Sequence, residues 1–321
     1  AIFIWGGFHA LAIAVILVIL EITLSFDNAV VNARVLAQMS PAWQKRFISW
    51  GIPIAVFGTR FLLPIFIVAL AVSLSPLVVA KLALFDPEKY GELLHGVHEL
   101  IAAFGGMFLL MVALKYFFDS AKEIHWIHVI EKQIVKFGRI EAIEIGIALF
   151  VLALISFFVP DHAEGVLFSG IIGILLFIIM QGISKSFANV AGKAAAASGF
   201  ALFMYLEVLD AAFSLDGVIG AFAITTDLPI IVVGLGIGAF FVRSLTIYFV
   251  KEKTLDTLIY LEHGAHWAIL GLAGAMLTSI FFPIPELITG LIGIVFVAAA
   301  YYSSRKLRSA GHVHDEPVLK K

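Results

Sequence analysis

Two apolar segments of membrane length carry acidic residues in nearly the same pattern. The first runs from Leu20 to Asn28 and the second from Leu209 to Gly217. Each has an acid, three further residues, a serine, an apolar residue and an aspartate. A charged side chain at the centre of a bilayer costs roughly 2.5–3.5 kcal/mol. The repeated acids therefore predict a cation, a proton or a basic partner, and the duplication allows both sets to share one.

The polar atoms of these segments are almost all oxygens, which suit hard cations such as Mg²⁺, Ca²⁺ and Mn²⁺ better than Zn²⁺ or Cu⁺. We expect six residues to bind the ion: Glu21, Asp27, Asn28, Glu207, Asp210 and Asp216. Three residues would support them: Ser25, Asn32 and Ser214. Several anions around one site favour a divalent ion over a monovalent one.

Helical geometry divides each set. One stripe holds Glu21, Ser25 and Asn28 in the first copy, and Glu207, Asp210 and Ser214 in the second. Asp27 points about 120° away from its stripe in an ideal helix, and Asp216 also leaves its stripe. Either both helices are locally unwound near the serine, or each aspartate addresses a neighbouring helix.

An alternative interpretation is that the acids only pair with arginines and hold the bundle together. Arg34, Arg60 and Arg243 lie in apolar segments, but five acids outnumber three arginines. Both interpretations can hold at once, because Arg60 and Arg243 can balance the charge of an empty site or gate it.

Histidine pairs form a second duplicated feature, at His95 and His98 beside Glu99, and at His263 and His266 beside Glu262. Imidazoles bind softer metals, transfer protons or cap helix ends. A membrane-embedded metalloenzyme would require the two pairs to converge at one depth.

Composition indicates a membrane protein. The hydrophobic fraction is 61%, charged residues make up 14%, and mean hydropathy is +1.05. The absence of cysteine excludes disulfides and thiolate metal sites. We expect the opening apolar run to be a mature helix and not a signal peptide, because no basic segment precedes it.

Windows of about 20 apolar residues predict nine membrane spans. They cover roughly 9–37, 48–73, 95–118, 142–160, 164–186, 199–224, 228–250, 257–282 and 285–304. The polar stretch 119–141 is expected to be an extramembrane helix or linker, and 74–94 a loop that dips back toward the membrane. With nine spans, fifteen Lys and Arg residues fall on one side and only Lys81 and Lys89 on the other. This asymmetry predicts a cytoplasmic C-terminus.

Corresponding features lie five spans apart, and an odd number inverts the second copy relative to the first. The sequence therefore predicts an all-α polytopic membrane protein with an inverted repeat of four plus four helices, an arrangement typical of secondary transporters. The predicted units are repeat 1 at 1–160, a connecting helix at 161–198, repeat 2 at 199–304 and a cytoplasmic tail at 305–321.

The first acidic motif, together with residues 43–47 and 50–53, resembles the TerC family of tellurium-resistance membrane proteins, in a bacterial branch of it. The second motif, with Asp210, Ser214, Asp216 and Gly217, also fits. The resemblance implies a superfamily of small-solute and cation exporters, with the intramembrane acids associated with metal ions and notably with Mn²⁺ efflux.

We therefore expect a divalent cation exporter of the bacterial inner membrane, with Mn²⁺ or Ca²⁺ as the transported substrate, and not an enzyme. Alternating access would expose the midplane site, and protons would occupy the emptied carboxylates on the return step. The alternatives are a membrane metal sensor or scaffold that uses the basic 119–141 segment for docking, and the histidine-based metalloenzyme. We expect metal ions and the bilayer as partners, no nucleic acid, and leave homo-oligomer formation open.

Overall fold

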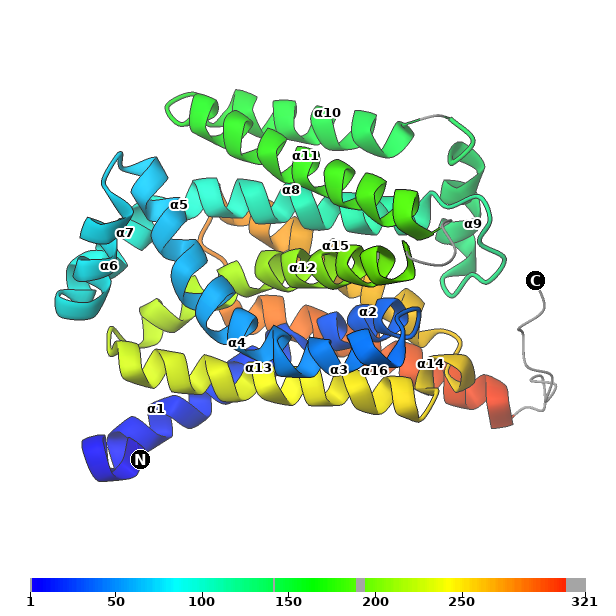
Figure 1. The fold of residues 1–321 in the computed structure, drawn as a ribbon. Coiled ribbons are helices and arrows are strands. Elements are labelled where there is room, and N and C mark those ends of the chain that lie inside the picture. The colour runs from blue at the N-terminus through cyan, green and yellow to red at the C-terminus, as the bar shows by residue number, and fades with distance from the viewer. Residues whose placement is uncertain (1, 141, 189–193, 310–321) are drawn as a thin grey trace.

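The computed structural model describes residues 2–140, 142–188 and 194–309, and every regular element in these ranges is a helix (Figure 1). In chain order the elements are α1 (Ile2–Leu24), α2 (Phe26–Leu36), α3 (Pro41–Ser49), α4 (Gly51–Pro53), the π-helix η1 (Ile54–Leu62), α5 (Leu63–Ala71), α6 (Pro76–Phe85), α7 (Pro87–Gly96), α8 (His98–Phe117), α9 (His128–Phe137), α10 (Ile143–Phe158), α11 (Ala163–Ala188), α12 (Ala194–Ile224), α13 (Leu228–Lys251), α14 (Thr254–Thr257), α15 (Leu261–Ser279) and α16 (Glu286–Ser309). The predicted tail beyond residue 309 lies outside the described residues.

Six helical stretches among the described residues are long and apolar enough to cross a membrane. They are Gly6–Leu24, Pro41–Ala71, His98–Phe117, Ala163–Ile183, Leu228–Lys251 and Ile288–Ser309. A bilayer core of about 30 Å requires about 20 helical residues. Each stretch coincides with a predicted span, so the chain is built as a multi-pass helical membrane protein.

The other three predicted spans are also helices, but they are less clear membrane segments. Helix α10 has 16 residues and is therefore about 24 Å long. Helix α12 is long, but three acids interrupt its apolar sequence, and α15 begins with Glu262, His263 and His266. The count of nine spans stays a prediction.

The stretch 74–94 is not the loop that the sequence predicted. It folds into the short helices α6 and α7. Each begins with a proline, whose fixed φ suits the first helical turn. The side chain of Asp86 caps α7 by accepting from the Lys89 N–H at 3.3 Å. Windows of about 20 apolar residues could not detect these helices, because each helix is only ten residues long.

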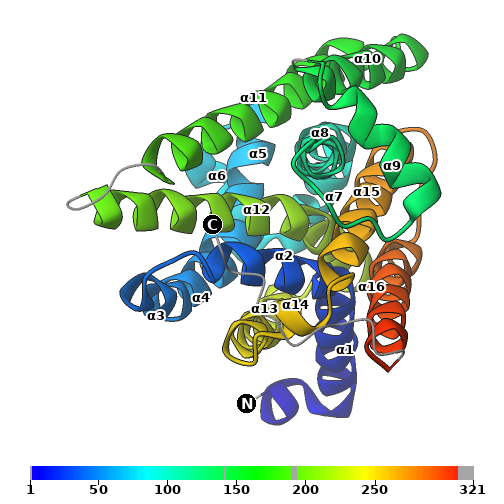
Figure 2. The same cartoon turned by 90° about the vertical axis from the view of Figure 1, so that its right-hand side faces the viewer.

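Helices α8 and α15 pack against each other in the middle of the bundle. Figure 2, which looks nearly along α8 and α13, places α10 and α11 on one side of this pair and α1, α13 and α16 on the other. Helix α1 lies along α13, and η1 lies along α12. In Figure 1, α8 begins at the left and ends at the right, whereas α15 runs the opposite way, as α12 does relative to α1.

The first two spans are interrupted, whereas their predicted counterparts are not. At Ser25 the backbone leaves the helical conformation (φ −110°, ψ 11°) between α1 and α2. The second span includes the nine-residue π-helix η1, a rare form that is frequent at functional sites. Helices α12 and α13 run without a break. Of the two alternatives left by the sequence, local unwinding near the serine therefore holds for the first motif and not for the second.

Candidate functional site

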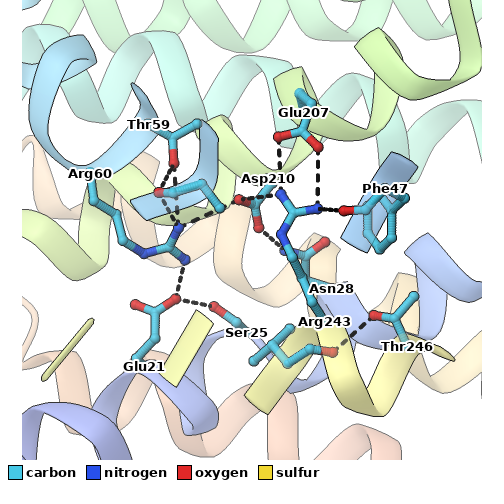
Figure 3. Close-up of polar contacts among 12 residues, drawn as sticks. Glu21, Ser25, Asn28, Phe47, Thr59, Arg60, Glu207, Asp210, Arg243 and Thr246 are labelled. Atoms are coloured by element: carbon cyan, nitrogen blue, oxygen red, sulfur yellow. Dashed lines mark hydrogen bonds and ion pairs between the residues drawn. The ribbon is translucent and has the colours of Figure 1, made fainter. Parts of the chain in front are cut away.

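Five charged side chains meet in the interior of the bundle (Figure 3). They are Glu21 on α1, Arg60 on η1, Glu207 and Asp210 on α12, and Arg243 on α13. Each is at most 7% exposed. Burying a charge without a partner is costly, so the contacts among these groups decide whether the bundle tolerates them.

The Arg60 guanidinium group joins the two acidic segments. Its Nη2 pairs with Glu21 Oε1, and its Nη1 lies 3.5 Å from Asp210 Oδ2. Nη1 also donates to the Ala55 carbonyl oxygen at 2.7 Å, five residues earlier in η1. Ser25, at the break between α1 and α2, donates its hydroxyl to Glu21 Oε1 at 3.0 Å.

Arg243 makes a fork with Glu207. Its two terminal nitrogens lie 3.2 and 3.0 Å from the two oxygens of that carboxylate, and Nη2 also lies 3.4 Å from Asp210 Oδ2. Phe47 on α3 covers the guanidinium, with its ring centroid 4.5 Å from the Arg243 Cζ and its carbonyl oxygen 3.5 Å from Nη1. Such two-point contacts are the strong form of an arginine–carboxylate pair.

Asp210 connects both arginines. Its Oδ2 faces Arg60 and Arg243, and its Oδ1 accepts from the Asn28 side-chain amide at 3.0 Å. The network thus joins three carboxylates and two guanidinium groups, which leaves one negative charge when all five are ionised. If the acids served only to pair with arginines and hold the bundle together, a third carboxylate would not be needed.

Glycines let two backbone segments approach the network closely. A Cβ at Gly51 would overlap Arg243 Nη1 and lie 2.8 Å from Glu207 Oε1. A Cβ at Gly238 on α13 would lie 2.5 Å from the Cβ and Cγ of Glu21. No side chain larger than glycine fits either position without moving a charged group.

Several buried oxygen atoms near the network accept no hydrogen bond from any described residue. They are Asp27 Oδ1, Asn28 Oδ1, Asn32 Oδ1 and Ser214 Oγ. Buried polar groups are normally satisfied, so each of these atoms requires an explanation. As oxygen ligands they are of the type that hard divalent cations prefer.

The structure brings together only part of the predicted metal site. Glu21, Asn28, Glu207 and Asp210 share one network, with Ser25 beside it. Asp27 does not join them: it points toward α16, where a Cβ at Gly293 would lie 3.6 Å from its Oδ1. Asp27 thus points away from the stripe of Glu21, Ser25 and Asn28, as helical spacing predicted. The Asp216 side chain lies outside the described residues.

Among the residues that the structure describes, no three His, Asp or Glu side chains converge to hold a metal ion. The acids of the network face the arginines instead. The predicted pairing with arginines therefore exists for Arg60 and Arg243. Arg34 is separate, since it is largely exposed and lies 3.5 Å from Glu262.

The two histidine pairs lie at opposite ends of α15. His98 Nε2 is 3.5 Å from Ser279 Oγ, at the end of that helix. His263 lies sixteen residues earlier, about 24 Å along the axis. The convergence that a histidine-based metalloenzyme would require is therefore absent from these two pairs.

Each histidine pair has local neighbours instead. His263 Nδ1 is 2.9 Å from Glu131, and the His266 ring stacks on Tyr116 with centroids 3.6 Å apart. At the other end, one cavity of about 400 Å³ has three of the predicted residues in its lining: His95, His98 and Glu99. Glu99 Oε2 also lies 3.7 Å from His162 Nδ1.

Sequence reasoning missed Phe47, Gly51 and Glu131. Gly51 lies in the same apolar stretch as Arg60, and a glycine there was a usable signal, because it permits close approach of the backbone. Phe47 is one of 29 phenylalanines, and nothing in its local sequence distinguishes it. Glu131 is one of several charges in a polar stretch.

Comparison with known proteins gives a single result. No curated protein and no solved structure matches the chain. One family model, described as Protein of unknown function (DUF475), matches residues 26–309 and so includes both arginines and most of the acidic network. The chain therefore belongs to the DUF475 family.

Proposed function

We propose that this protein exports a divalent metal cation across the bacterial inner membrane, with Mn²⁺ as the first candidate and Ca²⁺ as the second. The buried carboxylate network is the transport site. Four helices of each repeat, joined by α11 and inverted relative to each other, expose it alternately to the two sides. The C-terminus is cytoplasmic in this proposal, as the distribution of Lys and Arg predicts.

The observation that carries the proposal is the position of Asp210. This carboxylate contacts an arginine from each repeat and the Asn28 amide of the first acidic motif. Ion sites of secondary transporters lie between repeats near the midplane, where interrupted helices contribute polar groups. Helix α1 is interrupted at Ser25, whose hydroxyl contacts Glu21.

Cargo and arginines compete in this mechanism. Arg60 and Arg243 balance the carboxylates when no cation is bound. A divalent cation takes their place on Glu21, Glu207 and Asp210, and the unsatisfied oxygens of Asn28 and Ser214 complete its coordination. The resemblance of the acidic motif to the TerC family supports Mn²⁺ as cargo. Proton uptake by the emptied carboxylates would drive the return step.

A membrane metal sensor or scaffold is the alternative. It is favoured by the pairing of every network carboxylate with an arginine. A sensor would bind the cation and change shape without passing it across the membrane.

Measuring Mn²⁺ flux through reconstituted protein distinguishes a transporter from a sensor. Liposomes that contain the purified chain should take up Mn²⁺ above protein-free liposomes, with a rate that depends on pH. Asp210→Asn and Glu21→Gln should abolish most of this uptake, because each removes a charge and a ligand together. Glu144→Gln is the matched control, because Glu144 pairs with Lys115 at 2.7 Å and lies outside the network.

Uptake that matches protein-free liposomes, in protein that still binds Mn²⁺, would replace transport with sensing. Uptake that is unchanged in Asp210→Asn would remove the network from the transport path. Uptake without pH dependence would keep the transporter and reject the proton-coupled return.

A further inference from the structure

Helix α9 is held at one end of the bundle by a single buried carboxylate. Glu131 is 0% exposed and accepts from the main-chain N–H groups of Trp126 and Ile127, both at 3.2 Å. From α15 it contacts Trp267 Nε1 and His263 Nδ1, each at 2.9 Å. These contacts fix which face of α9 turns toward the protein.

The lysine beside this carboxylate strengthens the attachment. Lys122 Nζ lies 3.0 Å from Glu131 and 4.1 Å from the centre of the Tyr116 ring. Burial by itself would raise the pKa of Glu131, but the hydrogen bonds from His263, Trp267 and Lys122 outweigh it and lower the pKa well below its usual range. The carboxylate is therefore ionised at neutral pH.

The face of α9 that turns away from the protein is apolar and basic. Val129 is 82% exposed, Phe137 57% and Ile130 44%. At about 100° per residue, the exposed Gln133 lies between Val129 and Phe137 on this strip, and Lys132 and Lys136 lie together on one of its borders. Both lysines are exposed, as is Arg139 just beyond the helix. None of these three cations has a carboxylate within 4.0 Å among the described residues.

The position of α9 in the bundle indicates what surrounds its exposed face. The helix crosses the end of the bundle next to the start of α10 (Figures 1 and 2). Helix α8, one of the six stretches long and apolar enough to cross a membrane, ends at Phe117. Tyr116, in its last turn, contacts Lys122, which pairs with Glu131 on α9. The end of α8 therefore places α9 at the level of the lipid headgroups.

We propose that α9 is an interfacial anchor that binds anionic phospholipid. Val129, Ile130 and Phe137 enter the boundary between headgroups and acyl chains, and Lys132, Lys136 and Arg139 contact the phosphates. An apolar strip bordered by lysines is the pattern of helices that lie in the membrane interface. Because Glu131 joins α9 to α15, lipid bound there is coupled to the central helix pair. The proposal does not depend on the transported ion.

Depth-dependent quenching tests this proposal in the whole protein. The chain has no cysteine, so Val129→Cys and Phe137→Cys each give one site for a fluorescent label. The labelled proteins are placed in nanodiscs of phosphatidylcholine alone or mixed with phosphatidylglycerol. We expect a lipid nitroxide near the headgroup to quench both labels, and aqueous iodide to quench them weakly.

A charge variant tests the lipid headgroup. A lysine near an anionic surface contributes roughly fivefold in affinity. Lys132→Gln with Lys136→Gln should therefore raise the fraction of phosphatidylglycerol required for half-maximal lipid quenching several-fold. The matched control is Lys251→Gln with Lys253→Gln, two exposed lysines around the end of α13. This control should leave the titration unchanged.

Strong quenching by iodide and none by lipid nitroxide would overturn the proposal. So would lipid quenching that does not respond to phosphatidylglycerol or to the lysine substitutions. Labels that iodide reaches in nanodiscs, but not in native membrane vesicles, would assign this face to a protein partner instead of lipid.

Discussion

Arg60 and Arg243 both pair with buried carboxylates, but the helices that carry the two pairs differ in regularity. Arg60 lies on a π-helix, opposite a helix that breaks at Ser25. Arg243 lies on an unbroken helix, forms a fork with Glu207 and is enclosed by Phe47 and Gly51. Irregular helices rearrange at lower cost than regular ones, so we expect the Arg60 side to open first when a cation enters.

The largest expected difference between the two sides is in stability. Arg243→Met should lower the free energy of unfolding by about 3–5 kcal/mol, because Glu207 would lose the only partner that the described residues give it. Arg60→Met should cost less, since Glu21 keeps Ser25, and Asp210 keeps Arg243 and Asn28. Unfolding by denaturant in detergent measures both. A larger loss for Arg60→Met would reverse the comparison.

Two glycines, one beside Arg243 and one on the helix of Arg60, allow the two sides to be compared by substitution in the backbone. Gly51→Ala should cost about 1–3 kcal/mol, because the added methyl group overlaps Arg243 and Glu207. Gly58→Ala in η1 should be neutral or stabilising, since its Cβ would meet Ile54 at an acceptable 3.4 Å and alanine favours helices by about 1 kcal/mol. Thermal unfolding of the two variants tests this. Equal melting temperatures would show that the Arg243 side is not tightly closed.

The two serines of the repeated motif should differ by a smaller amount. Ser25→Ala removes a hydrogen bond to Glu21 and should cost about 1 kcal/mol. Ser214→Ala should change stability by less than about 0.5 kcal/mol, the lower end of what one hydrogen bond contributes, because no described residue bonds its hydroxyl. If Ser214 is a cargo ligand, the same variant should weaken Mn²⁺ binding. A stability loss at Ser214 as large as that at Ser25 would instead assign it a structural partner.

The smallest effect is expected from pH at Glu131, a buried acid that no arginine holds. Burial would raise the pKa of Glu131, but its hydrogen bonds lower it well below the usual value. A group with a lowered folded-state pKa stabilises fully above its unfolded pKa of about 4.3, and loses that contribution only as pH falls further. Hydrogen exchange of α9, corrected for intrinsic rates, should therefore be unchanged between pH 7 and 5. Faster opening at pH 5 would contradict this.

The part of the site that repeats in the sequence was predictable. Acids at equivalent positions of the two apolar segments identified Glu21 and Asp210 as candidates, and Glu207 added a carboxylate to the second segment. Arg60 and Arg243 were identified as arginines in apolar segments that can balance the charge of such a site. Helical spacing also predicted that Asp27 leaves the stripe. These inferences succeed because charge in an apolar segment is rare and costly.

What the sequence could not predict depends on contacts between distant segments. Fork geometry at Arg243 and the shared Asp210 arise from packing of α12 against η1 and α13, which no local pattern encodes. The π-helix depends on tertiary packing, and its residues have an ordinary apolar pattern. Glu131 becomes buried only because α15 supplies Trp267 and His263.

In the proposed mechanism, a divalent cation and the two arginines compete for the shared carboxylates. Calorimetric titration of Mn²⁺ into the purified protein tests it most directly. We predict binding by the unmodified chain and by Glu144→Gln, and loss of binding in Asp210→Asn while its far-ultraviolet circular dichroism stays the same. Undiminished Mn²⁺ binding by a folded Asp210→Asn protein would contradict the account.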